Sequence, residues 1–306
     1  MVDLFSLSTE MNNKNSENIE LQDTSEILTR INNEDKTVAY SVEKEIKSIT
    51  NLIDAILDND TKNTRIIYIG SGTSGRLGIL DASECPPTYG VSPEVVQGII
   101  AGGKEAIFKA KENAEDDILQ GELDLKEINI TSEDIVIGLS ASGRTPYVVG
   151  ALKYANSLGC ITGSISCSKN SEISNLAKYP IEVVVGPEIV TGSTRMKSGT
   201  AQKMILNMIS TTVMIKKGKV FSGYMVDVKT SNKKLVERAK RIIMNTTNSS
   251  YELASKTLEK SQMNVKLAIV MILLNIDKDS AYIKLENYDN NVARLIHEYT
   301  NKNDRK

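Results

Sequence analysis

The sequence predicts an α/β fold: a five-stranded parallel sheet flanked by helices, followed by a small, all-helical C-terminal subdomain. Two observations predict it. Short apolar runs recur that end in glycine and hydroxyl residues, and helix-like segments fill the gaps between them. Continuous rather than alternating apolar strands are typical of parallel sheets that are buried on both faces. Beyond about residue 223 only short helical patterns follow.

The five expected strands are apolar runs bounded by turn residues. With the residues that end them, the runs span 65–76, 94–103, 134–145, 160–166 and 181–188. Helices are expected in the gaps, notably over 146–158 and 196–216. Parallel sheets of this kind bind ligands at the carboxyl ends of their strands, so the residues after each run are the first place to seek function.

Segments of different character lie before and after the sheet. Residues 1–34 are polar, and the first ~20 are not expected to pack tightly. From residue 35, apolar side chains at helical spacing predict one long amphipathic helix over 35–58. The sheet domain is expected over 35–222 and the helical subdomain over 223–306. The helices of that subdomain are expected over 230–245, 250–260, 265–274 and 280–287.

The composition excludes several classes of function. A net charge of −2 and the lack of Trp argue against nucleic-acid binding. One histidine, His297, and three scattered cysteines do not suit a zinc site, a Ser-His-Asp triad or a disulfide framework. The N-terminus does not resemble a secretory signal, and no apolar stretch is long enough to span a membrane. A cytoplasmic protein is therefore expected.

Two polar loops follow predicted strands. Residues 70–76 combine glycines with hydroxyl residues and open a helix, where backbone amides and hydroxyls bind anions. This loop is neither a Walker A sequence nor a dinucleotide fingerprint, and alone it is equally consistent with an ordinary turn. Residues 140–146 repeat the pattern, with Pro146 suited to a first helical turn. Together the loops could converge on one phosphate, with Arg76 or Arg144 adding charge.

A third polar loop, residues 191–199, also precedes a predicted helix. Arg195 and Lys197 could bind a phosphate or carboxylate, and surface charge at a helix start explains them nearly as well. Glu188 could line the same pocket. Without a usable histidine, glutamates are the natural candidates for acid–base chemistry, and they occur in the segments 80–90 and 113–117.

The first two loops resemble those of the sugar isomerase (SIS) domain of phosphosugar isomerases and regulators, which implies a SIS-type α/β sandwich. In that family, hydroxyls hold the phosphate of the sugar. The resemblance implies this role for the hydroxyls that align here, which are Thr73, Ser74, Ser140, Ser142 and Thr145. Ser71, where relatives often carry Ala, and Arg144 are further expected substrate contacts.

Between about residues 20 and 300 the chain also resembles the N-acetylmuramic acid 6-phosphate etherase family, most clearly in four segments. These are 76–90, 113–117, 141–148 and 186–203, the last of which the glucokinase regulatory protein shares. The resemblance implies a carbon–oxygen lyase. It would remove D-lactate by elimination across C2 and C3 of the phosphorylated amino sugar, then add water to give N-acetylglucosamine 6-phosphate.

The same resemblance implies the catalytic groups. Glu115 would abstract the C2 proton, and Glu84 would protonate the departing ether oxygen. No metal or organic cofactor is implied. A homodimer is expected, because the predicted helices over 35–58 and 196–216 offer wide apolar faces.

Both glutamates are expected about ten residues past a helix start, ~15 Å from the strand ends. Either these helices end early, as Gly78 and the prolines after Glu84 allow, or a neighbouring subunit completes the pocket. Two other functions stay open. An aldose–ketose isomerase of the same fold would explain the loops but not the glutamate segments, and a regulatory sugar-phosphate-binding protein would share residues 186–200.

Overall fold

The structure is a computed structural model that describes residues 9–61, 63–230 and 232–303. The chain forms two compact units. The first lies within residues 1–83 and 92–210, and the second within 84–91 and 211–306. No helix in the described ranges is both long enough and apolar enough to cross a membrane.

The predicted five-stranded parallel sheet is confirmed and forms the centre of the first unit. Its strands are β1 Ile66–Gly70, β2 Val96–Ile100, β3 Ile135–Leu139, β4 Ile161–Ser166 and β5 Tyr179–Glu182. The fifth strand lies earlier than expected, because the chain turns at Gly186, whose φ is +73°, and Pro187 has no N–H for a ladder. The spatial order is β2-β1-β3-β4-β5, with all neighbours parallel.

This strand order places a switch point at the middle of the sheet. The chain leaves β1 for β2 on one side and then returns to β3 on the other. The last residues of β1 and β3, Gly70 and Leu139, lie opposite each other in the register. The two polar loops that follow them therefore begin side by side, at the place where open α/β sheets bind ligands.

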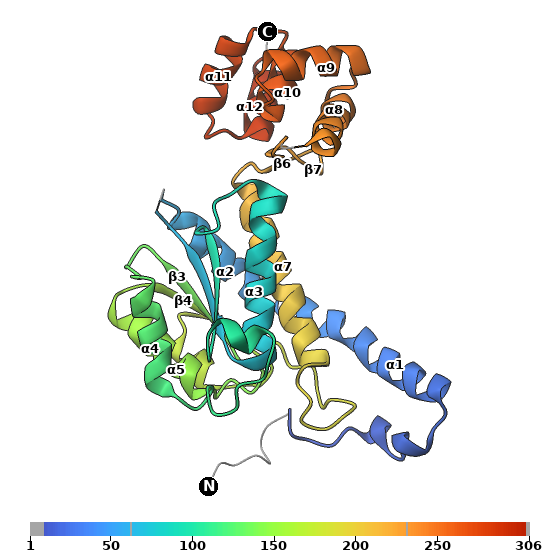
Figure 1. The fold of residues 1–306 in the computed structure, drawn as a ribbon, viewed down its shortest axis with the longest axis vertical. Helices are drawn as coiled ribbons and strands as arrows, with labels where there is room; N and C mark the ends of the chain where they lie inside the picture. The colour runs from blue at the N-terminus through green and yellow to red at the C-terminus, as the bar shows by residue number, and fades with distance from the viewer. Residues whose placement is uncertain (1–8, 62, 231, 304–306) are drawn as a thin grey trace. The chain divides into compact units, whose positions relative to one another are not determined.

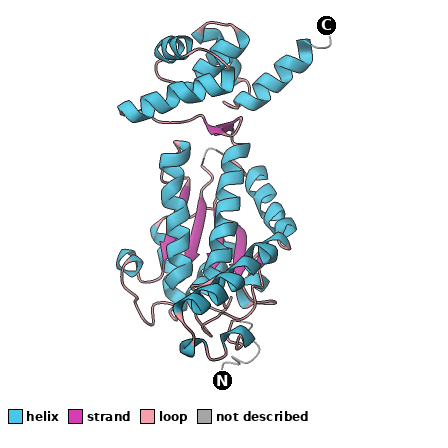
Figure 2. Cartoon of the chain, turned by 90° about the vertical axis from the view of Figure 1, so that its right-hand side faces the viewer, coloured by secondary structure: helices cyan, strands magenta, loops and turns pink. Residues whose placement is uncertain are grey.

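Helices cover both faces of the sheet (Figures 1 and 2). The helices that begin in the first unit are η1 Lys14–Ser16, η2 Ile19–Leu21, α1 Thr24–Glu43, α2 Ile46–Asp58, α3 Gly72–Tyr89, η3 Lys104–Ile107, α4 Ile118–Glu127, α5 Pro146–Ser157, α6 Glu172–Leu176 and α7 Lys197–Lys216. On one face, Gly138 packs against Val148 of α5, and on the other Gly163 packs against Leu52 of α2.

The expected helix over 35–58 is wrong in its bounds. The segment forms two helices, and the first begins at Thr24, where the Asp23 side chain accepts a hydrogen bond from the Glu26 amide. The described residues before it also pack more tightly than expected. Thr9 is buried, and the Asn13 side chain donates to the carbonyl of Pro187 at 3.0 Å.

Helix α3 also differs from expectation, because Pro86 and Pro87 lie inside it rather than ending it. Both prolines occupy the last turn, where few intrahelical hydrogen bonds remain to be lost. The helix ends at Tyr89, and Gly90 follows with a left-handed φ of +68° while its amide bonds to the Pro86 carbonyl at 3.0 Å. The helix is therefore continuous through Glu84.

The second unit is mainly helical, as predicted. A two-stranded hairpin, β6 Val220–Phe221 and β7 Tyr224–Met225, precedes α8 Lys233–Thr247, α9 Tyr251–Lys260, α10 Val265–Leu274, α11 Lys278–Glu286 and α12 Val292–Asn303. Side chains of Asn232, Ser250, Asn264 and Asp277 cap four of these helices. Their apolar faces form one core that includes Ile243, Leu258 and Ile269.

Candidate active site

The first polar loop is held tightly between β1 and α3. The Gly75 amide donates to the Ser71 carbonyl at 3.0 Å, which starts the helix. A Cβ on Gly70 would lie 2.9 Å from the Gly75 nitrogen and 3.0 Å from the Leu139 carbonyl oxygen. Only glycine allows this close approach, so the loop has a fixed position relative to β3.

Glu115 lies beside this loop, contrary to the expectation that a helix carries it away. It belongs to a turn over residues 112–116, and α4 begins only at Ile118. The helix starts late because Asn113 has a left-handed φ of +66° and the Asp117 side chain caps the amides of Leu119 and Gln120.

Two hydrogen bonds tie Glu115 to both polar loops. The Ser71 hydroxyl donates to Glu115 Oε2 at 3.1 Å. The backbone carbonyl of Glu115 accepts from the Tyr147 amide at 3.0 Å, in the first turn of the helix that follows the second loop. The carboxylate itself is exposed. An accessible carboxylate thus lies at the carboxyl ends of β1 and β3.

A pocket of about 360 Å³ opens beside Glu115. Its lining comes from the first loop, η3 and the turn over 112–116, and it includes Ser71, Gly72, Arg76, Ala106, Lys111 and Glu115. Arg76 donates to the carbonyls of Ala106 and Ile107 at 2.7 and 2.9 Å, so it holds η3 as a wall of the pocket. Lys111 pairs with Glu105 at 3.0 Å.

The second polar loop contains a cluster of three hydroxyls. The Ser140 Oγ lies 2.8 Å from Thr145 Oγ1 and 3.4 Å from Ser142 Oγ. The Gly143 amide donates to Ser140 at 3.0 Å, and the Arg144 amide donates to Ser142 at 3.4 Å. Hydroxyls and amides at the start of a helix are suited to hold an oxyanion such as a phosphate.

The remaining hydroxyls of the first loop face the start of α7. Ser74 is buried, and its hydroxyl donates to Gln202 Oε1 at 2.8 Å. The Thr73 methyl lies against Gly199, 3.4 Å from where a Cβ would stand. The structure therefore does not bring the Ser74 hydroxyl into the cluster of the second loop.

The third polar loop supplies mainly internal contacts. Glu188 is fully buried and caps α7, accepting from the amides of Lys197 and Ser198 at 2.9 Å each.

Lys197 is buried as well and pairs with Glu34 at 2.5 Å. Burial alone would raise the pKa of Glu34, but hydrogen bonds from Lys197 and Asn15 outweigh it and hold that pKa below its ordinary value. Arg195 is exposed on the loop.

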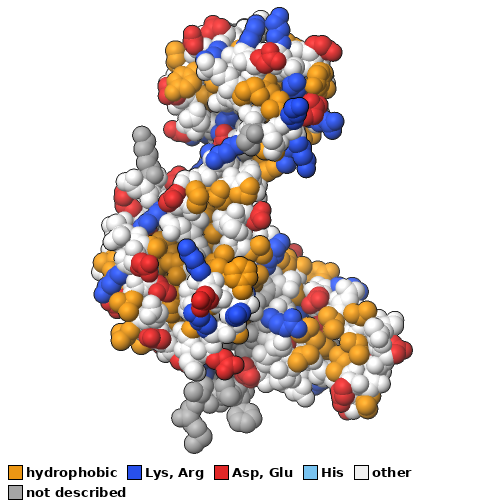
Figure 3. Space-filling view, in the orientation of Figure 1, with side chains coloured by type: hydrophobic (Ala, Val, Ile, Leu, Met, Phe, Trp, Pro, Cys, Tyr) orange, Lys and Arg blue, Asp and Glu red, His pale blue; other side chains and the backbone are white. Residues whose placement is uncertain are grey.

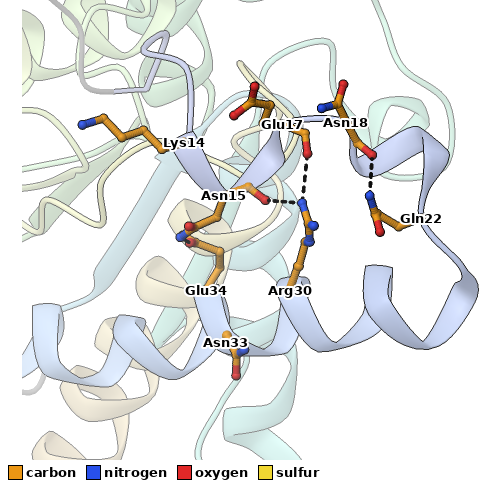
Figure 4. A pocket seen from close by; sticks show the side chains of 8 residues that line it. All are labelled: Lys14, Asn15, Glu17, Asn18, Gln22, Arg30, Asn33 and Glu34. Atoms are coloured by element: carbon orange, nitrogen blue, oxygen red, sulfur yellow. Dashed lines mark hydrogen bonds between the residues drawn. The ribbon is translucent and has the colours of Figure 1, made fainter.

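Glu34 also lines a second pocket of about 500 Å³, between α1 and the segment before it. Figure 4 shows the Asn15 side chain beside Glu34 and the Arg30 side chain directed toward the segment before α1. Asn15 donates to Glu34 at 2.7 Å, and Arg30 donates to the carbonyls of Asn15 and Glu17 at 3.3 and 2.9 Å. Glu34 thus bonds both to Asn15 and to Lys197, so it joins Lys197 to the segment before α1.

Glu84 is exposed on α3 and belongs to the second unit. One turn earlier the same helix buries Asp81, which sequence reasoning missed. Burial raises the pKa of Asp81, opposed by a hydrogen bond from the Ser210 hydroxyl at 3.1 Å. Its spacing from Gly78 and Cys85, on the buried face of the helix, is the signal that could have identified it.

The sheet, with polar loops after β1 and β3, belongs to the class of sugar isomerase (SIS) domains, as family models show. The family model of the glucokinase regulatory protein N-terminal SIS domain matches residues 48–156, and that of the SIS domain matches 118–212. A putative phosphosugar isomerase involved in capsule formation from Bacteroides fragilis shares the fold, with a TM-score of 0.50, 14% identity and coverage of 67% of this chain and 98% of that chain.

Curated relatives identify the family more closely. An N-acetylmuramic acid 6-phosphate etherase from Clostridium botulinum is 58% identical over 95% of this chain and 96% of its own. Etherases from Clostridioides difficile and Clostridium beijerinckii are 55% and 54% identical, over 96% and 98% of this chain and 96% and 99% of their own. The chain belongs to the N-acetylmuramic acid 6-phosphate etherase family, which confirms the resemblance in the sequence.

Proposed function

We propose that this chain is a carbon–oxygen lyase that releases D-lactate from N-acetylmuramic acid 6-phosphate and leaves N-acetylglucosamine 6-phosphate. Full-length identity to etherases supports the activity. The structural observation that carries it is Glu115, an exposed carboxylate hydrogen-bonded to the loop after β1 and anchored to the helix after β3. The test is lactate release from this substrate by the purified protein.

In the proposed mechanism Glu115 acts as the base. The open-chain sugar carries an aldehyde at C1, which makes the C2 proton acidic enough for a carboxylate to remove. The electron pair left at C2 then expels the lactyl oxygen from C3, and Glu84 gives that oxygen its proton. Water adds at C3 of the unsaturated aldehyde, with its oxygen on C3 and a proton returned to C2. Every atom of the products is accounted for without a cofactor.

The phosphate is proposed to rest on the second loop. The Ser140 hydroxyl lies within hydrogen-bonding distance of those of both Ser142 and Thr145, around the start of α5. Their protons can rotate toward a ligand, and the backbone amides of the loop add further donors. Thr73 and Arg144 are proposed to complete the cradle, and Glu188, Lys197 and Arg195 to support it from the third loop.

Glu84 is proposed to come from a second copy of the chain. The alternative that α3 ends early is wrong, because the helix runs unbroken from Gly72 to Tyr89. A helix rises about 1.5 Å per residue, so Glu84 lies ~18 Å beyond its first residue. We therefore propose a homodimer in which each pocket receives Glu115 from one subunit and Glu84 of the partner subunit.

The segment that comprises η2 and α1 supports a homodimer. Apolar side chains are visible on its surface (Figure 3), and Leu21, Leu28 and Tyr40 in this region are 77%, 60% and 68% exposed. Exposed apolar side chains of this size are typical of interaction surfaces. A mass measurement in solution should give a dimer, and a monomer that persists at all concentrations would refute this part of the proposal.

A mixed dimer tests the shared pocket directly. Glu84→Gln and Glu115→Gln subunits, each inactive alone, should regain activity when they are coexpressed. One of the two pockets in a mixed dimer then holds both glutamates, so about a quarter of the normal activity is expected from random pairing. Pockets built within one subunit would give no recovery.

The match to the glucokinase regulatory protein domain favours a second candidate, a regulatory sugar-phosphate-binding protein. Such a protein, or an aldose–ketose isomerase of this fold, would bind the phosphorylated sugar without releasing lactate. The lactate assay with the unmodified protein separates these functions from the etherase. Three buried cysteines scattered along the sequence suit the reducing cytoplasm, which is the compartment we propose for this activity.

A further inference from the structure

We infer that Ser71 is a positioning residue for the proposed base, holding the Glu115 carboxylate in its working orientation instead of holding the phosphate. This inference rests on the proposed etherase activity and deepens it. The motivating contact joins residues far apart in the sequence, since the Ser71 hydroxyl donates to Glu115 Oε2 at 3.1 Å.

Glu115 needs such a contact because, in the part of the chain that the structure describes, no other hydrogen bond holds its carboxylate. Its side chain is exposed on a turn, where a glutamate samples many rotamers and would lose conformational entropy on each turnover. Within the described residues, the Ser71 hydroxyl is the hydrogen-bond donor to this carboxylate. The bond fixes Oε2 and leaves Oε1 to receive a proton, so it favours a single productive orientation.

Both ends of the contact are held by the backbone. The Ser71 carbonyl accepts from the Gly75 amide, and the preceding glycine packs directly on the end of β3. The Glu115 carbonyl accepts from the amide of Tyr147. Tyr147 is itself buried, and its hydroxyl donates to Asp124 at 2.5 Å. The donor and the acceptor are thus joined to the sheet and to α5, which makes the geometry reproducible.

The number of protons decides between the two roles. A serine hydroxyl has one proton to donate, and a carboxylate and a phosphate dianion both accept hydrogen bonds. If Ser71 donates to Glu115, it has none left for the phosphate. The second loop has three hydroxyls that contact only one another and loop amides in the described structure, so the phosphate does not require Ser71.

The test compares Ser71→Ala and Ser71→Thr with the unmodified protein. Loss of the hydroxyl should lower kcat for lactate release and the rate of C2 proton exchange in heavy water by about 3- to 10-fold, with KM nearly unchanged. Threonine retains a hydroxyl and should restore most of both rates. Binding of N-acetylglucosamine 6-phosphate, measured by calorimetry, should be the same in all three proteins.

Ser142→Ala is the matched control, because it removes a hydroxyl from the other loop and should weaken product binding instead. A Ser71→Ala variant with weaker product binding and an unchanged kcat would overturn the inference and return Ser71 to the phosphate. A variant with unaltered kinetics would also overturn it. Failure of the unmodified protein to release lactate would refute the proposed function itself, and the inference with it.

Discussion

The two polar loops look alike in sequence but differ in their hydrogen bonds. Both follow central strands that pair directly, and both open a helix. The hydroxyls of the first loop bond to distant parts of the chain, Ser71 to Glu115 and Ser74 to Gln202. Those of the second loop bond to one another and to its own amides.

This difference indicates that the two loops have different chemical roles. A hydroxyl that already donates to a carboxylate or an amide oxygen orients that group and has no proton for a ligand. Hydroxyls that bond to one another and accept from the amides of their own loop can turn their protons toward an incoming oxyanion at little cost. The first loop is therefore suited to place catalytic and structural partners, and the second to bind phosphate. Substitutions in each loop separate these roles.

The largest effect is expected from the carboxylate next to the first loop. Glu115→Gln should abolish lactate release and C2 proton exchange, because Glu115 is the base of the proposed mechanism and an amide cannot remove that proton. Glu84→Gln should block lactate release yet leave some C2 exchange in heavy water, since deprotonation needs only the base and the aldehyde. Each change should cost about 10²–10⁴-fold in lactate release.

Product analysis and NMR of the C2 position measure both rates in the same sample. Exchange that persists in the Glu115 variant but vanishes in the Glu84 variant would mean that the roles are reversed. Nearly normal activity in both variants would refute the two-carboxylate mechanism and favour the binding-protein or isomerase function.

A second prediction concerns the glycines of the two loops. Gly143, with φ +71°, would place a Cβ 2.2 Å from Ser171 Cβ, whereas Gly72, with φ +50°, has nothing within 4 Å of that position. Gly143→Ala should therefore destabilise the fold by about 3 kcal/mol or more, from backbone strain together with overpacking. Gly72→Ala should cost only about 1–2 kcal/mol, from the left-handed backbone alone.

Denaturant unfolding followed by far-UV circular dichroism measures this difference, because the chain has no Trp for a fluorescence signal. Equal losses of unfolding free energy in the two variants would mean that the second loop can shift away from Ser171. Its hydroxyl cluster would then be less rigid than the first loop.

The third prediction measures ligand contacts in the second loop. Ser142→Ala should raise KM about tenfold and change kcat little, because the phosphate is remote from C2 and C3 and is bound equally well throughout the reaction. Thr73→Val should act in the same direction if Thr73 completes the cradle. A lower kcat at constant KM in either variant would contradict the phosphate assignment.

The sequence predicts the fold well, because buried parallel strands and amphipathic helices have strong local patterns. Five strands and the C-terminal helices occur near their expected positions. The errors come from local features that override such patterns. Gly186 and Pro187 shorten the fifth strand, and the prolines after Glu84 fall in the last turn of α3, where a helix tolerates them.

The site was harder to predict, because its residues interact through contacts that no local pattern encodes. The position of Glu115 depends on a left-handed Asn113 and a cap by Asp117, which together replace an expected helix by a turn. The Ser71–Glu115 and Lys197–Glu34 contacts join residues that are distant in sequence. The loops were visible in the sequence, but the partners of their hydroxyls were not.

The smallest effect on catalysis is expected from Ser74→Ala. This variant tests most directly whether the hydroxyls of the two loops have different roles. The resemblance to SIS domains assigns this hydroxyl to the phosphate, whereas in the structure it is buried and donates to Gln202 Oε1 at 2.8 Å. Its removal leaves that amide oxygen without its donor, so unfolding free energy should fall by about 1–2 kcal/mol while KM stays within about twofold of normal. Ser142→Ala, measured alongside, should show the opposite pattern of a raised KM and little loss of stability. If Ser74→Ala instead raises KM as much as Ser142→Ala does, the Ser74 hydroxyl must turn from Gln202 to the ligand on binding. Both loops would then hold the phosphate, and the division between them would apply to the unliganded protein alone.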